Sequence, residues 1–264
     1  MNSGTTKDDN QKHIMYSIVD GVMQIGINRP EKKNALSQAM YCSLTHAIKL
    51  AVSDDSVRVI ILSGHGGEFT SGNDLADFAD AANLDSGDNP TTVFLRTFTN
   101  CPKPIVVAVD GVAIGIGTTL LMHSDFVYAS TNSRFKLPFV SLGLCPEYAS
   151  SLILPRLMGH VKAAEWLLLG DDILPNDAMV AGLINAVVED PLAKAQEIAK
   201  RLALQAPSAV RTAKALMKRA TKVDVDDAIM AEIVEFSRSL KGPEFSEAVS
   251  AFFEKRSPDF SNLK

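Results

Sequence analysis

The chain has 264 residues, of which 46% are hydrophobic and 22% are charged. This is the composition of a globular protein long enough to bury one large core, and no apolar run reaches the length of a membrane span. With 31 acidic and 26 basic residues the net charge is −5, so the sequence offers no basic footprint for nucleic acid or an anionic membrane surface.

Neither end of the chain carries a targeting pattern. Residues Met1 to Lys12 are polar and include acidic side chains, which predicts a disordered tail and not a secretory or transit peptide. The final SNLK differs from the Ser-Lys-Leu peroxisomal address. The three cysteines show neither paired nor metal-like spacing, which favours free thiols in a reducing compartment. We therefore expect a cytoplasmic protein.

The first part of the chain alternates short apolar runs with helical patterns. A helix is expected after the N-cap residue Ser37, and the small, polar stretch from Ala81 to Pro90 is expected to be a mobile connection. The predicted strands are Ile14 to Asp20, Val22 to Asn28, Val57 to Leu62, Ile105 to Val109 and Phe126 to Ala129, and the predicted helices are Gln38 to Val52, Thr92 to Asn100 and Thr118 to His123. This order predicts repeated ββα units, rather than a continuous parallel sheet.

From Tyr148 onward the pattern is mainly helical, with a last strand at Leu183 to Val188. The expected helices are Ser150 to Leu157, Val161 to Leu168, Pro175 to Ala181, Pro191 to Leu204, Ala209 to Ala220, Val225 to Ser239 and Glu244 to Phe253. Periodicity alone establishes a mixed α/β chain with a helical carboxy-terminal part.

One glycine turn carries the strongest indication of function. The apolar run Pro104 to Val109 leads through Gly115 and Gly117 into the helix expected at Thr118. The first N–H groups of a helix lack intrahelical partners, and the helix dipole adds positive charge there, so an anion or a developing oxyanion is stabilised at such a turn. The same glycines equally suit close packing of a strand against a helix.

A second strand, Ile60 to Leu62, runs into the loop GHGGEFTSGNDL, so two loops could each supply one N–H to a thioester oxygen. These two segments resemble the F-S-A-G-A-D-L and N-G-x-A-x-G-G-G motifs of the enoyl-CoA hydratase/isomerase (crotonase) superfamily. The resemblance extends from Asn28-Arg29-Pro30 and Asn34-Ala35-Leu36 to Phe252-Phe253-Glu254-Lys255-Arg256. It therefore covers nearly the whole chain after the first dozen residues.

The resemblance implies a fold and a substrate. The fold is a crotonase-like spiral of ββα units over residues 13–200, with a helical trimerisation region over residues 201–264. The substrate is an acyl-CoA thioester, so coenzyme A is part of the substrate and neither a cofactor nor a metal is expected. The assembly is a homotrimer or a hexamer. Carried over by position, the oxyanion donors are the N–H groups of Ser71 and Ile116, and the binding residues are Lys32, Asp74, Leu75, Gly115, Thr119, Phe139, Phe252 and Lys255.

Hydratases of this family use two glutamates on one water, since hydration needs both an acid and a base. The matching positions here are Thr119 and Phe139, and neither can transfer a proton as a carboxylate does. Thr119 is expected beside the pocket, where its hydroxyl could orient a neighbour. Phe139 is expected to line the acyl pocket or to pack below it, and Asp74 to hold its loop.

A carboxylate does follow in Pro146-Glu147-Tyr148-Ala149-Ser150-Ser151, a pattern that resembles the monofunctional 3,2-trans-enoyl-CoA isomerases. Isomerisation needs one base, which removes a proton from C2 and returns it to C4. Apolar neighbours such as Leu144 should raise the pKa of Glu147. Three alternatives remain open at this point: Glu147 caps the next helix, the enzyme is a weakened hydratase, or the chain binds acyl-CoA without turnover.

Overall fold

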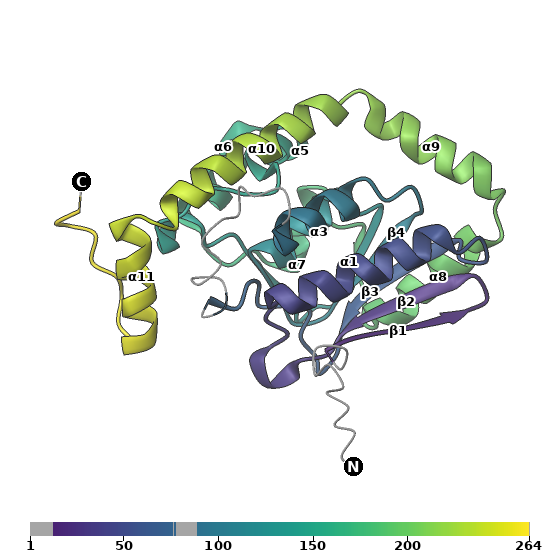
Figure 1. The fold of residues 1–264 in the computed structure, drawn as a ribbon, viewed down its shortest axis with the longest axis horizontal. Coiled ribbons are helices and arrows are strands. Elements are labelled where there is room, and N and C mark those ends of the chain that lie inside the picture. Colours follow the sequence, from purple (N-terminus) through teal and green to yellow (C-terminus); the bar gives the residue numbers. More distant parts are fainter. Residues whose placement is uncertain (1–12, 76, 78–88, 264) are drawn as a thin grey trace, which may run out of the picture.

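The computed structural model describes residues 13–75, 77 and 89–263. Its strands form a sheet in the order β1-β2-β3-β4-β6-β8 (Figure 1). Their bounds are Ile14–Val19 (β1), Val22–Ile27 (β2), Val59–Gly64 (β3), Ile105–Val109 (β4), Phe126–Ala129 (β6) and Ala186–Val187 (β8). β1 and β2 are antiparallel, while every later pair is parallel. The parallel strands therefore direct their carboxyl ends toward one edge of the sheet.

A second, small sheet pairs β5 (Val112–Ile114) with β7 (Arg134–Lys136) in parallel. A bridge between Thr70 and Ala113 extends this layer to the loop that follows β3. After the β1–β2 pair, which lies in the large sheet, β4 and β6 join the large sheet while β5 and β7, which follow them, form the small layer. The prediction of repeated ββα units is confirmed, but its contrast with a continuous parallel sheet was wrong, because the large sheet is parallel from β2 onward. β5 and β7, at three residues each, are too short for a periodic pattern to reveal.

Helices cover both faces of the large sheet. On one face α8 (Pro191–Ala203) packs Ala195, Ile198 and Ala199 against strand residues that include Ile61 and Val106. On the other face lie α1 (Gln38–Ser53) and α3 (Pro90–Thr99), whose apolar sides enter the larger core (Figure 1). α1 begins where predicted, because Ser37 Oγ accepts the Met40 N–H.

The remaining helical segments are η2 (Pro30–Lys32), α4 (Ile116–Thr119), η3 (Leu120–His123), η4 (Val140–Leu142), α5 (Ser150–Met158), α6 (His160–Ala164), η5 (Glu165–Leu169), α7 (Pro175–Val180), α9 (Pro207–Arg219), α10 (Lys222–Ser239) and α11 (Pro243–Glu254). The helix predicted over Thr118 to His123 is split between α4 and η3. It also begins two residues earlier, since Gly115 takes the conformation that starts it.

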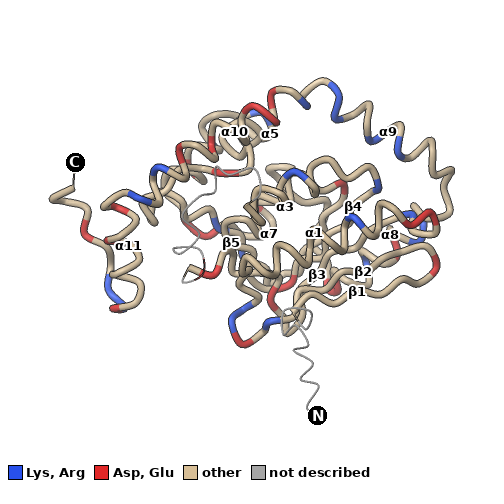
Figure 2. The backbone as a smooth tube through the Cα atoms, viewed as in Figure 1, with Lys and Arg blue, Asp and Glu red and all other residues tan. Residues whose placement is uncertain are grey.

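The C-terminal helices α9, α10 and α11 run along the body and then away from it, so that α11 stands apart from the sheet (Figure 1). Lysines attach α9 to the body: Lys214 Nζ donates to Asp125 Oδ2 at 2.6 Å and to the Lys103 carbonyl at 2.8 Å. Lysine and arginine positions, coloured blue, recur along α9 in Figure 2. In the described part of the chain, no helix is long and apolar enough to cross a membrane. The tail predicted over residues 1–12, and residues 81–88 of the predicted mobile connection, lie outside that part.

Candidate active site

The two glycine loops singled out in the sequence lie side by side. Thr70 and Ala113 form a parallel bridge, in which the Thr70 N–H donates to the Val112 carbonyl at 2.9 Å. The Glu68 carboxylate accepts the Val112 N–H at 2.7 Å, which ties the loops a second time. At Gly72 the approach is so close that a Cβ would lie 2.7 Å from the Ile114 carbonyl oxygen. Glycine is therefore required at this crossing.

The N–H predicted as the first oxyanion donor is already used. Ser71 donates its N–H to the Lys33 carbonyl at 2.9 Å and its hydroxyl to the Lys32 carbonyl at 3.3 Å. Gly72, with φ of 91°, then reorients the chain. Asn73 follows in a parallel bridge to Leu36.

That bridge leaves the N–H of Asn73 available. The Leu36 N–H donates to the Gly72 carbonyl, and the Leu36 carbonyl accepts the Asp74 N–H, so the Asn73 N–H points away from Leu36. Among the described residues, no backbone carbonyl accepts it. The Ser71 N–H therefore does not fit the predicted donor role, and the Asn73 N–H is the candidate in its place. The sequence analysis missed Asn73, because only the kink at Gly72 distinguishes two N–H groups so close in sequence.

Gly115 and Ile116 form the second half of the predicted hole. Gly115 has φ of 55° and ψ of −117°, a conformation that disfavours side chains, and its N–H donates to the Lys136 carbonyl at 2.9 Å. Ile116 is the first residue of α4, where a backbone N–H has no intrahelical acceptor. Its side chain is buried in the core, so the Cβ that replaces the family's glycine is accommodated there.

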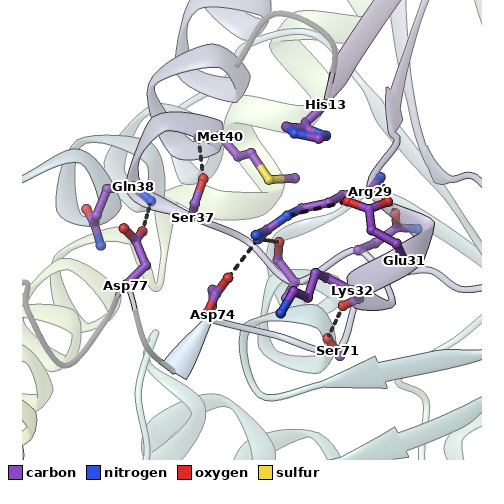
Figure 3. Close-up of polar contacts among 12 residues, drawn as sticks. His13, Arg29, Glu31, Lys32, Ser37, Gln38, Met40, Ser71, Asp74 and Asp77 are labelled. Atoms are coloured by element: carbon purple, nitrogen blue, oxygen red, sulfur yellow. Dashed lines mark hydrogen bonds and ion pairs between the residues drawn. The ribbon is translucent and has the colours of Figure 1, made fainter. Parts of the chain in front are cut away.

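Polar side chains hold the first loop (Figure 3). Arg29 Nη1 donates to Asp74 Oδ2 at 2.8 Å and to the Ala35 carbonyl at 3.1 Å. Tyr41, buried on α1, donates its hydroxyl to Asn73 Oδ1. The contact of Asp74 is the one expected of a residue that holds the loop. Leu75 follows, half-buried.

Glu147 lies against α4, because Thr119 Oγ1 donates to Glu147 Oε1 at 2.5 Å. Thr119 is one helical turn after Ile116, so the hydroxyl that binds the carboxyl group and the predicted second donor belong to the same short helix. Thr119 occupies the place where a hydratase would present its glutamate, and here it orients the carboxyl of another. This contact brings together the two residues on which the choice of chemistry depends.

Burial raises the pKa of the Glu147 carboxyl to about 8, against the lowering effect of the Thr119 hydrogen bond. The negative charge of Glu232 on α10 adds to the increase. A carboxyl group with such a pKa exchanges protons near neutral pH, which is the property required of a proton shuttle.

The alternative that Glu147 caps α5 is excluded by another carboxylate. Glu232 accepts hydrogen bonds from the N–H of Ala149 and from the N–H and Oγ of Ser151, at 3.0 Å and 2.5 Å for the latter two. These groups form the start of α5 (Ser150–Met158). Glu232 therefore performs the capping, and the side chain of Glu147 is directed to Thr119 instead.

Three other residues near Glu147 are held in packing or hydrogen-bonding contacts of the core and are not reactive groups. Phe139 is buried and packs edge-on against Phe236 of α10, with ring centres 6.4 Å apart. Burial raises the pKa of the Cys145 thiol to about 11, so this thiol is unreactive at neutral pH. Burial lowers the pKa of His123 to about 4, and its Nε2 lies 2.8 Å from the Tyr148 carbonyl. His123 is thus a neutral, bonded histidine of the core.

The residues predicted to contact coenzyme A are exposed and lie in two places. Lys32 is on η2, and its carbonyl contacts Ser71 at the edge of the first loop (Figure 3). Phe252 and Lys255 lie at the end of α11, which stands apart from the sheet (Figure 1). The structure of this single chain brings Lys32 to the candidate site but not Phe252 or Lys255.

The model of the family described as "Enoyl-CoA hydratase/isomerase" matches residues 17–263. The chain belongs to this family. It is 34% identical to the mouse "Enoyl-CoA delta isomerase 3, peroxisomal" over 93% of this chain and 79% of the mouse protein. It spans 57% of the rat "Enoyl-CoA delta isomerase 2", at 37% identity over 82% of this chain.

Relatives named as hydratases match comparably well. The Escherichia coli "2,3-dehydroadipyl-CoA hydratase" is 31% identical over 90% of this chain and 94% of its own length. Among solved structures, Pseudomonas aeruginosa OdaA superposes with a TM-score of 0.89 at 43% identity, over 91% of this chain and 98% of OdaA. These matches show a crotonase-fold enzyme family that processes acyl-CoA.

Proposed function

We propose that this chain is a Δ3,Δ2-enoyl-CoA isomerase of fatty-acid β-oxidation. The observation that carries the proposal is the pairing of Thr119 with Glu147. One carboxyl group stands beside the oxyanion hole, and a hydroxyl group occupies the place where hydration would need a second carboxyl. One base and one hole meet the needs of isomerisation, whereas hydration needs an acid and a base on one water.

The proposed reaction moves one proton. The Glu147 carboxylate takes a proton from C2 of a 3-enoyl thioester, and the electrons of that bond move onto the thioester oxygen as a dienolate. The N–H groups of Asn73 and Ile116 stabilise this oxygen as its charge develops. The Glu147 carboxyl then returns the proton to C4, which leaves the double bond between C2 and C3. Apart from the coenzyme A of the substrate, this chemistry uses no cofactor.

A hydratase is the second candidate, because relatives named as hydratases match at 31% identity or more. A chain that binds acyl-CoA without turnover is the third. Purified wild-type protein is to be assayed with 3-cis and 3-trans enoyl-CoA of several chain lengths, and with crotonyl-CoA for hydration.

Glu147→Gln is the decisive variant, and Glu189→Gln, which removes an exposed carboxyl, is the matched control. We expect isomerisation to fall about 1,000-fold in Glu147→Gln alone. Hydration that exceeds isomerisation in the wild type and survives Glu147→Gln would identify a hydratase. Tight binding of acyl-CoA with neither rate would identify the silent binder.

We further propose a homotrimer or a hexamer. Two groups of exposed apolar side chains support it: Val161, Leu168, Leu169, Leu174 and Val180 on α6, η5 and α7, and Phe252 and Phe253 on α11. Such surfaces are typical of contacts between subunits. In the assembly, Phe252 and Lys255 would approach a neighbouring subunit's substrate, and Lys32 would meet a phosphate of the chain's own ligand. Sedimentation analysis of the full chain tests the assembly, and a monomer would contradict it.

A further inference from the structure

The turn that presents Glu147 has an unfavourable backbone. Tyr148 and Ala149 follow one another with φ of 60° and 58°, in the left-handed region. This region costs a residue with a side chain roughly 1 kcal/mol or more, and a turn of this kind persists only where its surroundings hold it. Strain directly beside a functional carboxyl points to groups that fix its position.

Two sets of contacts hold the turn. Tyr148 is held from the body: its hydroxyl donates to the Leu95 carbonyl and accepts from Thr99 Oγ1, each at 3.0 Å, and its ring stacks on His123. None of these partners of Tyr148 carries a charge near pH 7, since burial lowers the pKa of His123 to about 4. The second set comes from a single side chain in the C-terminal helical region.

That side chain is Glu232, in the middle of α10. It is 7% exposed, and its carboxylate receives three hydrogen bonds from Ala149 and Ser151. The Ala149 N–H belongs to one of the strained residues, and Ser151 to the first turn of α5. Burial raises the pKa of this carboxyl, while its hydrogen bonds from Ser151 and Ala149 act in the opposite direction and favour the charged form. These hydrogen bonds form a firm link between α10 and the turn.

We propose that Glu232 is a positioning residue, which holds from the C-terminal region the turn that aims the Glu147 carboxyl at the oxyanion hole. This inference rests on the proposed function of Glu147. Its consequence is that the seating of α10 on the body affects catalysis, although no residue of α10 has a role in the proposed proton transfer.

A charge effect accompanies the geometric one. Burial is the main cause of the raised pKa of Glu147, and the charge of Glu232 acts in the same direction. The other titratable groups that interact with Glu147 are Tyr41 of α1 and, in its own segment, Cys145 and Tyr148. Burial raises the pKa of each of these three, so they are neutral near pH 7. Removal of the Glu232 charge should therefore lower the pKa of Glu147.

Glu232→Gln keeps the shape and one acceptor oxygen but removes the charge. Glu235→Gln on the same helix is the control, because Glu235 is exposed and pairs with Arg238. We expect Glu232→Gln to lower kcat about tenfold with little change in KM, and to move the acid limb of the kcat/KM profile to lower pH. Glu235→Gln should match the wild type. A Glu232→Gln profile that superimposes on the wild type, with unchanged kcat, would overturn the proposal.

A direct titration separates this inference from the proposed function. Carbon-13 NMR of the Glu side-chain carboxyls, with the Glu147 signal assigned by its loss in Glu147→Gln, reports the protonation of Glu147 without any substrate. A lower titration midpoint in Glu232→Gln supports the link even if the enzyme does not isomerise. An unchanged midpoint in an active isomerase contradicts the link while leaving the proposed function intact. Thermal unfolding of both variants checks that they are folded.

Discussion

Two carboxyl groups lie at the segment of residues 147–151, one on the segment itself and one on α10. They differ in the hydrogen-bond donors that they accept from. Glu232 comes from the C-terminal helical region and receives three hydrogen bonds, two of them from backbone N–H groups. Glu147 belongs to the core and receives one, from the Thr119 hydroxyl. Burial raises the pKa of both carboxyl groups. The comparison teaches that the carboxyl group with three donors holds the turn in place, whereas the one with a single donor remains available for chemistry.

The largest expected effect is on stability. Glu232→Ala leaves the donors of Ala149 and Ser151 without their acceptor, and each unsatisfied buried donor costs about 1 kcal/mol or more. We expect the free energy of unfolding to fall by about 3 kcal/mol, measured by urea denaturation at pH 7. A loss no larger than that of Glu235→Ala would show that the carboxylate of Glu232 does not support the turn.

Glu147→Gln should change the free energy of unfolding in the opposite direction. The unfolded carboxyl ionises near pH 4.5, but the folded one only near 8, so the wild type loses stability as pH rises between these values. Because glutamine removes this loss, we expect the variant to be more stable by about 2 kcal/mol at pH 9. At pH 4 the two proteins should be nearly equal. Equal denaturation midpoints at both pH values would mean that the pKa of Glu147 is not raised.

The same carboxyl group should control the rate. Because a base must be ionised, kcat/KM for isomerisation should rise about tenfold per pH unit below the Glu147 pKa of about 8 and level off above it. The measurement is a kcat/KM profile from pH 5 to 9.5. An acid limb near pH 4.5 would indicate an exposed, unperturbed base.

Thr119→Val removes the one donor to Glu147 with little change in volume. The Thr119 hydrogen bond lowers the pKa of Glu147, so its loss should raise that pKa and move the acid limb to higher pH. At pH 7 we expect kcat/KM to fall about fivefold, since a hydrogen bond of this kind contributes about 1 kcal/mol. Thr118→Val, in the preceding position, is unsuitable as a control because the Thr118 hydroxyl donates to the Ala113 carbonyl. Thr97→Val on α3 is the better choice, since its hydroxyl bonds only within that helix.

The smallest expected effect concerns the first loop. Tyr41→Phe removes the hydroxyl that donates to Asn73 Oδ1, which loosens the residue whose N–H faces the hole. We expect kcat to fall about threefold, with KM nearly unchanged, because the backbone bonds of the loop remain. An unchanged kcat in Tyr41→Phe would show that this hydroxyl does not position Asn73.

Much of the fold was accessible from residue patterns. The apolar runs of β1, β2, β4 and β6 and the capped start of α1 were predicted within a residue or two, because each is governed by local periodicity and a local cap. β5 and β7 were missed, since their pairing partners lie elsewhere in the chain. The importance of Glu147 could be inferred from its motif, but the identity of the first hole donor could not, as the Ser71 and Asn73 N–H groups separate only through the kink at Gly72.

The sequence by itself determined the α/β class, the family and the absence of a second carboxyl at Thr119, because these depend on residue types and local spacing. The tertiary structure decided the roles. It directed the Thr119 hydroxyl to Glu147 and gave the capping of α5 to Glu232 across 81 residues of chain. It also buried both carboxyl groups, which raises the pKa of each, but gave them different hydrogen-bond donors. The physical reason is that burial and hydrogen bonding depend on neighbours that only the folded chain brings together.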